Sequence, residues 1–170
     1  MNKTGIQLGL FRFVDIDVQA WLALLNDADV NRYLPLATTP WDAAAVRQWM
    51  ADKDAQWADH GYGPWALRID GRFAGWGGFQ KEAHGADLAL VLHRAFWGAG
   101  PAVCRAMLAQ QAALGIERVS LLLPPERPHL RGLARLGFHP VGELTYDGCR
   151  FLHFVRDDCQ RPTVRMPASP

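Results

Sequence analysis

The segment from Leu88 to Leu108 constrains the fold of this chain more than any other part of its sequence. It opens with the apolar run Leu88–Leu92, continues through a loop that contains Gly98 and Gly100, and then becomes helix-like from Pro101. An apolar run of this length is typical of a strand that is covered on both faces. Proline is well tolerated at the first position of a helix. The segment therefore predicts a buried strand, a short glycine loop and a helix.

The glycine loop has the features of an anion-binding turn. Gly98 and Gly100 let the backbone approach a ligand closely and adopt a positive φ. The helix start presents unpaired N–H groups and a positive dipole end, which suit a group such as a pyrophosphate. A plain strand-to-helix turn explains the same residues equally well, because a single Gly-x-Gly is a weak motif. Val103 at the third glycine position disfavours a dinucleotide fingerprint, and Pro101-Ala102 disfavours a Walker loop.

The composition is that of a soluble globular protein. The chain has 170 residues, 49% of them hydrophobic and 21% charged, and its net charge of +1 gives no reason to expect nucleic acid or an anionic membrane as a partner. No apolar run is long enough to span a bilayer, and Met1–Gly5 lacks the apolar core of a signal peptide. Cys104, Cys149 and Cys159 show no metal-type spacing. We therefore expect a cytoplasmic protein without a metal, either a monomer or a homodimer.

Hydrophobic periodicity and turn residues predict the order β, α, α, β, β, β, α, β, α, β, β. The first strand is expected over Ile6–Val14, with Asp15 capping the next helix and Trp41-Asp42 opening another. The later predicted elements are strands Trp65–Ile69 and Phe73–Phe79 around Asp70-Gly71, a helix from Pro101 to Leu114 closed by Gly115, strand Val119–Leu123, helix Pro128–Leu136, and strands Phe138–Leu144 and Cys149–Val155 around Tyr146-Asp147-Gly148. This order predicts one α/β domain over residues 1–160, with a mixed sheet and helices on both faces, and an irregular tail over 161–170.

Four segments, taken together, resemble one known family. They are Arg32-Tyr33-Leu34-Pro35, Gly75-Trp76-Gly77-Gly78-Phe79, the run from Asp87 to Ala102, and Leu133-Ala134-Arg135-Leu136-Gly137-Phe138. In order and spacing they resemble the GNAT superfamily of acetyl-CoA-dependent N-acetyltransferases, especially the ribosomal-protein N-terminal acetyltransferases and their small-molecule relatives. The resemblance covers Leu8 to Val155. It implies a mostly antiparallel sheet with a central pair of splayed strands.

The resemblance also implies where acetyl-CoA, the cosubstrate, would bind. Backbone groups of the apolar strand would contact its pantetheine arm: Leu90, Val91 and Leu92. The loop and the helix start would hold its pyrophosphate: Gly98, Ala99, Gly100, Pro101 and Ala102, with Pro101 lacking an N–H. An N–H near Val91 would polarise the thioester carbonyl. Arg94 precedes the loop, where it could reach a phosphate or could equally be a solvated loop arginine. Trp97 is expected to pack beneath the loop, and Ala95 stands where the family usually has Arg or Gln.

The usual acid and base positions of the family carry apolar residues in this chain. The tyrosine acid falls at Leu133 and the strand glutamate base at Leu121. Glu126 and His129 stand where the family has Asn and Ser or Ala, and their spacing at a helix start lets them share one face and handle a proton. A helix-start acid and a surface histidine are the plain alternatives. Asp87, which opens the central strand, is the third catalytic candidate.

The acceptor side is expected in the first half of the chain. Arg32, Tyr33 and Trp76 are predicted to contact the acceptor, whereas most of the other tryptophans are expected in the core. The leading hypothesis is an enzyme that moves an acetyl group from acetyl-CoA to a primary amine, on a protein N-terminus or a small molecule. The alternative is a non-catalytic module of the same fold that binds acyl-CoA or another ligand.

Overall fold

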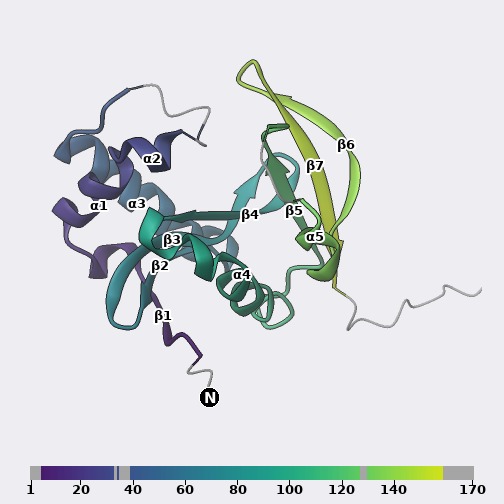
Figure 1. Cartoon of the computed structure of the whole chain (residues 1–170), viewed down its shortest axis with the longest axis horizontal. Coiled ribbons are helices and arrows are strands. Elements are labelled where there is room, and N and C mark those ends of the chain that lie inside the picture. Colours follow the sequence, from purple (N-terminus) through teal and green to yellow (C-terminus); the bar gives the residue numbers. More distant parts are fainter. Residues whose placement is uncertain (1–4, 33, 35–38, 127–129, 159–170) are drawn as a thin grey trace, which may run out of the picture.

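The computed structural model describes residues 5–32, 34, 39–126 and 130–158 (Figure 1). Its strands are β1 (Leu8–Phe11), β2 (Pro64–Ile69), β3 (Arg72–Glu82), β4 (Gly85–Leu92), β5 (Arg118–Leu123), β6 (His139–Tyr146) and β7 (Cys149–Asp157). Its helices are α1 (Val18–Leu25), α2 (Ala28–Asn31), α3 (Ala43–His60), α4 (Gly100–Leu108) and α5 (Gly132–Arg135), with short 3-10 turns η1 (Phe13–Asp15) and η2 (Arg94–Ala99). The predicted order of the strands and of the later helices is confirmed, but the structure has three helices between β1 and β2 where two are predicted, since Ala28–Asn31 forms the short helix α2.

The strands form one sheet in which a single neighbouring pair runs parallel. Its order is β1-β2-β3-β4-β5-β7-β6, and all described neighbours are antiparallel except β4 and β5. β4 and β5 pair only through Ala86 with Val119 and Asp87 with Ser120. Beyond these pairs the two strands diverge, and β5 turns toward the β6–β7 hairpin in Figure 1. The mixed, mostly antiparallel sheet and its splayed central pair are therefore confirmed.

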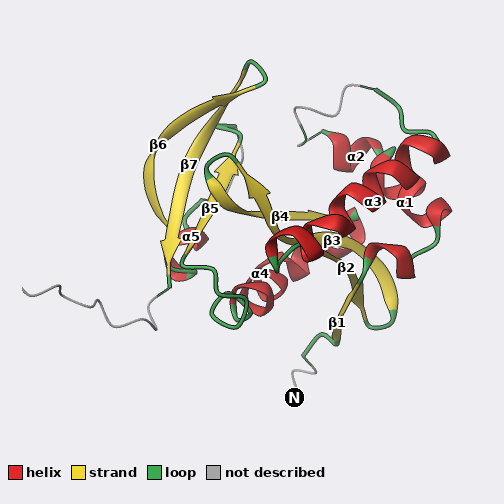
Figure 2. Ribbon diagram, turned by 180° about the vertical axis from the view of Figure 1, so that it is seen from behind, coloured by secondary structure: helices red, strands yellow, loops and turns green. Residues whose placement is uncertain are grey.

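Each face of the sheet has its own hydrophobic core, and β4 contributes to both. The first core joins the strands to α4 and contains Leu88 and Leu92. The second core lies under α1 and α3 and contains Val91 together with Trp21 and Trp76. Successive residues of a strand point to opposite faces, which explains why the β4 run has no polar residue. Figure 2 shows α1, α2 and α3 gathered at one end of the molecule and α5 at the other, with the β6–β7 hairpin.

Two glycines allow β3 to lie close to β4 and α4. Gly75 has a φ of +143°, and a Cβ placed there would collide with the carbonyl oxygen of Val91. A Cβ at Gly77 would lie 3.0 Å from the side chains of Leu90 and Met107. The segment that resembles the third strand of the family is therefore needed to pack the central strands, independently of any ligand.

Both predicted hairpin turns are present. Asp70 and Gly71 have φ values of +50° and +77°, and Asp147 and Gly148 have values of +47° and +77°. Positive φ at both central residues is typical of type I′ turns, whose twist matches that of the flanking strands.

The start of the chain differs from its predicted form. The first strand ends at Phe11 instead of Val14, because Phe13–Asp15 forms a 3-10 turn. Asp15 does not cap α1, since its carboxylate accepts the N–H of Arg12 at 2.9 Å. Asp17 takes the capping role and accepts the N–H of Gln19 at 2.8 Å.

The helix after the glycine loop is shorter than predicted. It ends at Leu108 instead of Leu114, and the chain continues in turns. Gln111 is buried there and donates its side-chain N–H to the carbonyl oxygen of Ile116 at 3.1 Å. Gly115 closes this segment with the expected positive φ, +68°. Helical periodicity predicts that backbone hydrogen bonds continue to Leu114. In the structure, the side-chain amide of Gln111 binds a backbone carbonyl in this segment.

Candidate active site

The divergence of β4 from β5 creates a slot with one open strand edge. Asp87 and Ser120 are the last residues that pair, so they mark the apex of this slot, which opens toward Leu92 on β4 and Leu123 on β5. Within the described chain, β4 keeps its ladder with β3 along this length, while β5 pairs with β7. Backbone groups on an open edge need other hydrogen-bond partners. The predicted contact residues are on this edge: Leu90, Val91 and Leu92.

The predicted pyrophosphate loop lies at the open end of the slot, where β4 leads through η2 into α4. α4 begins at Gly100, and Pro101 occupies its first turn. A Cβ added at Gly98 or Gly100 would meet no described atom within 4 Å, so the space beside both glycines is open. Neither has a positive φ, so that expectation is wrong and their contribution is small size. Residues 98–102, which include Ala99 and Ala102, are exposed or half-buried and thus accessible to a ligand.

Arg94 and Trp97 make contacts that differ from those expected. The guanidinium of Arg94 donates to the Asp29 carboxylate on α2 at 3.1 Å, so it points toward α2. Both side chains of this pair are largely exposed, and such pairs add little stability. Trp97 donates its indole N–H to the carbonyl oxygen of Leu92 at 2.9 Å and is 42% exposed. It ties the loop to the end of β4 without lying beneath it.

A cluster of polar side chains surrounds the apex of the slot. The carboxylate of Asp87 lies 3.3 Å from Nε2 of His84, which is in the turn between β3 and β4. The hydroxyl of Ser120 lies 3.0 Å from Nε2 of His153 on β7. The two imidazole rings meet edge to face, with their centroids 5.8 Å apart. We call these four residues the apex cluster.

Burial raises the pKa of Asp87 to about 6. The hydrogen bond and charge of His84 act in the opposite direction, the negative charge of Glu82 raises this pKa further, and the positive charge of Lys53 lowers it. A carboxylate tuned toward neutral pH is a common feature of catalytic acids and bases, although structural networks also produce it.

Lys53 brings a positive charge from α3 to the same face of the sheet. Its amine donates to the buried amide oxygen of Gln80, the residue that pairs with Asp87 across β3 and β4. The amine also lies 5.5 Å from the centre of the Trp76 ring. Burial lowers the pKa of Lys53, while the negative charges of Glu82, Asp87 and Asp52 raise it.

The half of the chain in which the acceptor is expected has a tryptophan-rich core. Trp76, 8% exposed, packs with its ring centre 5.6 Å from that of Trp49 and 6.1 Å from that of Phe13. Its indole N–H has no hydrogen-bond partner among the described residues. Arg32 follows the last residue of α2 and is exposed. Tyr33, the third predicted acceptor contact, lies outside the described residues.

The two other predicted catalytic residues are placed differently from Asp87. Glu126 is exposed and lies beyond the end of β5, beside a pocket of about 280 Å³ that is also lined by Cys149 and Arg150. Ser120 and Leu123 alone are about 10 Å apart along a strand, so Glu126 is at the open end of the slot, far from the apex. His129 lies outside the described residues. Asp87 is therefore the one predicted catalytic residue that the structure places at the apex.

Several residues of the site carry no local sequence signal. His84, Ser120, His153, Lys53 and Gln80 come from separate elements and meet only through the sheet and α3. Ser120 alone could have been noted, as a single hydroxyl between the apolar residues of β5.

Comparison with known proteins identifies the family to which this fold belongs. Residues 7–139 match the family described as "Acetyltransferase (GNAT) domain". The chain belongs to this family of GNAT acetyltransferases. A comparison with curated proteins gives no match.

Solved structures of similar fold include several acetyltransferases. A putative GNAT-family acetyltransferase from Bordetella pertussis is 22% identical, with a TM-score of 0.72 over 91% of this chain and 98% of its own. The aminoglycoside acetyltransferase AAC(6')-Ib in complex with ribostamycin and coenzyme A is 15% identical, with a TM-score of 0.69 over 96% and 99%. A ribosomal-protein-alanine N-acetyltransferase from Brucella melitensis is 17% identical, with a TM-score of 0.69 over 89% and 99%. At these identities the likeness shows the fold.

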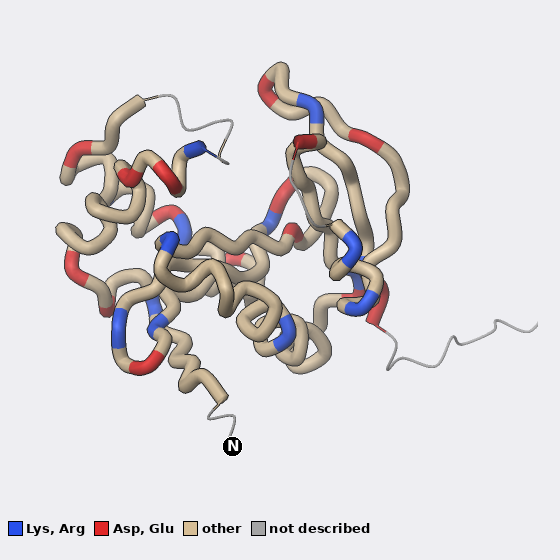
Figure 3. Tube along the Cα trace, in the orientation of Figure 1, with Lys and Arg blue, Asp and Glu red and all other residues tan. Residues whose placement is uncertain are grey.

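The described residues were also compared with the requirements of a metal site and of a membrane span. Among the described residues, no group of three or more His, Cys, Asp or Glu side chains is arranged to hold a metal ion. None of the described helices is both long and apolar enough to cross a membrane. Figure 3 shows acidic and basic residues interspersed along the described chain, in keeping with the net charge of +1.

Proposed function

We propose that this protein is an N-acetyltransferase that transfers the acetyl group of acetyl-CoA directly to a primary amine, on a protein N-terminus or a small molecule. One observation carries the proposal: a buried carboxylate, Asp87, lies at the apex of a slot that has an open strand edge on β4. An open edge suits an amide-containing arm, and a glycine loop with a helix start at the other end suits a pyrophosphate.

Asp87 is the proposed general base. An amine must lose a proton as its nitrogen attacks the thioester carbon, and the best base has a pKa near the working pH. The pKa of about 6 keeps Asp87 largely ionised at neutral pH while leaving it a stronger base than an exposed aspartate. A backbone N–H near Val91 would stabilise the negative charge on the carbonyl oxygen. Holding both reactants in one slot supplies much of the remaining acceleration.

His129 and Glu126 are proposed as secondary groups. The sequence favours His129 as the base, whereas the geometry favours Asp87, because Glu126 lies at the open end of the slot. We expect Asp87→Asn to lower kcat by roughly a hundredfold or more, and Glu126→Gln and His129→Ala to lower it by less than about tenfold. Steady-state kinetics of the three variants, with the Kd of acetyl-CoA measured separately, rank the candidates. A larger loss for His129→Ala than for Asp87→Asn would return the role of base to His129.

The acceptor class is proposed from the similar structures and from the acceptor side of this chain. One similar structure is an aminoglycoside acetyltransferase with ribostamycin, and another is a ribosomal-protein-alanine N-acetyltransferase. They support a small-molecule amine and a protein N-terminus as the two acceptor classes to test. Arg32, Tyr33 and Trp76 are the proposed contacts.

Coenzyme binding and catalysis are separated by two measurements. Acetyl-CoA at a hundred times its Kd should stabilise the folded chain by about 2.7 kcal/mol, which thermal unfolding detects. A panel of peptides, amino acids, polyamines and aminoglycosides, read by release of the coenzyme thiol, then identifies the acceptor. Stabilisation without thiol release from any amine would favour the non-catalytic acyl-CoA-binding module. Absence of both effects would contradict the proposal.

A further inference from the structure

Ser120 is an unusual residue for its place in the sheet. It is 2% exposed and stands on β5 between Val119 and Leu121, both of which belong to the first core. A buried hydroxyl costs stability unless it is hydrogen-bonded, and this one is bonded to His153 at 3.0 Å. Because Ser120 is the register partner of Asp87, its side chain is at the apex of the slot and on the same face of the sheet.

His153 connects Ser120 to the carboxylate of the apex cluster. Its ring meets that of His84 at 5.8 Å, and His84 in turn lies 3.3 Å from Asp87. The cluster therefore contains two hydrogen-bonded pairs, Asp87 with His84 and Ser120 with His153, whose imidazole rings pack edge to face. A hydrogen-bonded pair that includes a histidine can pass a proton between a reacting centre and its surroundings.

Besides a base that takes a proton from the amine, the acetyl transfer needs an acid that gives a proton to the departing coenzyme. When an amine attacks a thioester, the C–N bond forms, the C–S bond breaks, and the coenzyme leaves as a thiolate that takes up a proton. The residue at the usual tyrosine position of relatives is Leu133, which packs against the first core and has no proton to give. Among the described residues, Ser120 is the hydroxyl placed at the apex.

We infer that Ser120, supported by His153, donates the proton that the departing thiolate receives. This inference rests on the proposed acetyltransferase function. The Ser120 hydroxyl gives its proton to sulfur and regains one from Nε2 of His153. The second ring nitrogen of His153, a half-buried residue, takes up a proton from solvent. Asp87 releases the amine proton to solvent, which balances the proton that the thiolate consumed, and exchange with solvent returns the cluster to its starting state.

The surroundings of His153 suit this role. Burial lowers its pKa, and the nearby His84 lowers it further. A neutral imidazole carries one N–H and one free nitrogen, so it can release a proton at one atom while it accepts one at the other. The groups that face the cluster are Glu82 on β3, Lys53 on α3 and Asp87 on β4.

The test compares Ser120→Ala and His153→Ala with the parent in the thiol-release assay. Each variant is expected to lower kcat by roughly ten- to a hundredfold, while the Kd of acetyl-CoA stays within about twofold. Added imidazole is expected to restore part of the activity of His153→Ala, which a purely structural role would not allow. Ser120→Cys keeps a proton donor and should retain more activity than Ser120→Ala.

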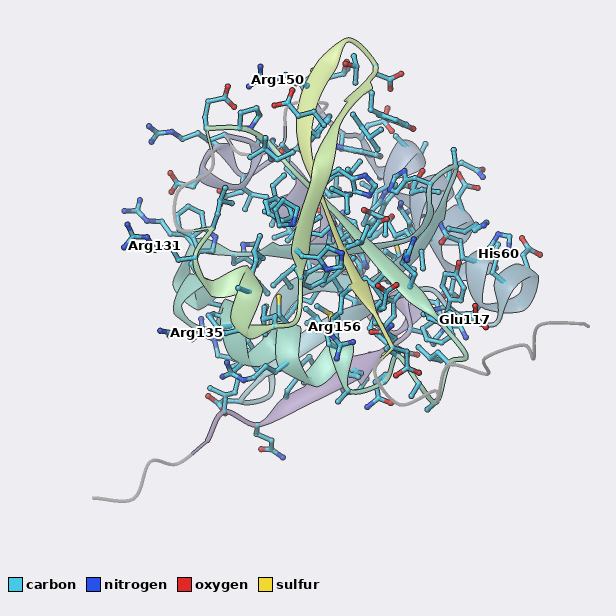
Figure 4. The ribbon with its side chains drawn as sticks, turned by 90° about the vertical axis from the view of Figure 1, so that its right-hand side faces the viewer. His60, Glu117, Arg131, Arg135, Arg150 and Arg156 are labelled. Atoms are coloured by element: carbon cyan, nitrogen blue, oxygen red, sulfur yellow. The ribbon has the colours of Figure 1, made fainter. Side chains whose placement is uncertain are left out.

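His60→Ala serves as the matched control. His60 is exposed at the end of α3, and Figure 4 shows it on the opposite side of the view from Arg131 and Arg135 of the α5 region. This variant should keep the kcat of the parent.

The outcomes separate the two proposals. A parent that releases no thiol with any amine overturns the enzyme and with it this inference. An active parent whose Ser120→Ala and His153→Ala variants keep full kcat overturns the inference alone. If Ser120→Ala fails to fold, the imidazole response of His153→Ala decides. If His153→Ala fails to fold, the comparison of Ser120→Ala with Ser120→Cys decides. Absence of rescue in the first case, or equal kcat in the second, contradicts the role.

Discussion

At the scale of single residues, Asp87 shows how burial prepares a group for chemistry. The sequence identifies it as an acid at the entry of a strand, a position that is usually solvated. In the folded chain it is enclosed beside His84 and under Lys53, and its pKa rises to about 6. Ionisation of this carboxylate therefore costs stability, and its raised pKa suits the proposed proton transfer.

The first prediction at this scale concerns the neighbours of Asp87. Lys53 lowers its pKa and Glu82 raises it. Lys53→Met should therefore move the acidic limb of the kcat/KM profile to higher pH, and Glu82→Gln should move it to lower pH. The measurement is the pH dependence of kcat/KM from pH 5 to pH 8. Lys81→Met, which removes an exposed lysine next to Glu82 on β3, is the control and should leave the acidic limb in place. Shifts of the same sign in both variants would contradict the role of Asp87 as the base.

The second prediction concerns stability. The pKa of Asp87 is higher in the folded chain than its ordinary value of 3.8, so folding favours the protonated form. Its ionisation between about pH 4 and about pH 6 then costs stability, and the full cost is present above pH 6. Two pKa units correspond to about 3 kcal/mol. Asp87→Asn avoids this cost, so it should raise the free energy of unfolding at pH 7.5 by up to that amount and by much less at pH 4.

Urea unfolding at the two pH values measures this difference. Asp59→Asn, at an exposed position of α3, is the control and should change stability equally little at both. A variant that is less stable than the parent at pH 7.5 would show that the ionised carboxylate is stabilised in place. In that case the role of burial in raising its pKa would be wrong.

At the scale of elements, the glycines of the loop between β4 and α4 leave open space beside the backbone, whereas Gly75 and Gly77 of β3 let this strand pack closely against β4. Space is open beside Gly100, whereas Gly75 is pressed against the backbone of β4. The same residue type thus serves two purposes, which the sequence motifs do not separate. The loop also connects to α2 through Arg94 and Asp29.

A paired substitution tests this distinction. Gly100→Glu should fold normally, because its side chain enters open space, but should abolish coenzyme binding by placing a negative charge where the pyrophosphate is expected. Gly75→Ala should instead lower the melting temperature, since the new methyl group collides with β4 at a φ that alanine rarely adopts. Calorimetry of acetyl-CoA binding and thermal unfolding read the two effects, with Gly100→Ala as the control for size. Tight binding by Gly100→Glu would show that the phosphates lie elsewhere.

Ala95 offers a gain-of-function test of the same element. It stands exposed on η2, where an arginine side chain has room. Ala95→Arg should tighten acetyl-CoA binding, and the gain should shrink as salt is added, because salt screens exposed charges. The measurement is the Kd at low and high salt, with Ala95→Gln as an uncharged control. A Kd that does not change at either salt concentration would place this position away from the phosphates.

At the scale of the whole molecule, β4 is the strand on which the two cores and the slot depend. It shares Leu88 and Leu92 with the core under α4 and Val91 with the core under α1 and α3, and it separates from β5 after Asp87. A strand enclosed on both faces keeps a fixed position, so the open edge of the slot is held rigidly. This is the arrangement that a reaction governed by proximity requires.

The sequence by itself determined the order of the strands, both hairpin turns, the apolar central strand and the family, but it predicted one helix too few between β1 and β2. These features follow from local rules: alternation, helical spacing, and residues that tolerate a positive φ. It misplaced the cap of α1 and the end of α4. Asp17 caps α1 and the buried Gln111 binds a backbone carbonyl beyond α4, and the periodicity of the sequence reveals neither hydrogen bond.

Only the tertiary structure decided which polar groups meet at the slot. His84, Ser120 and His153 are far apart along the chain, and they come together because β3, β4, β5 and β7 are neighbours in one sheet. The direction of Arg94 and the raised pKa of Asp87 depend in the same way on segments that pack from a distance. Burial and pairing between remote strands set these properties, and no local pattern of residues encodes either of them.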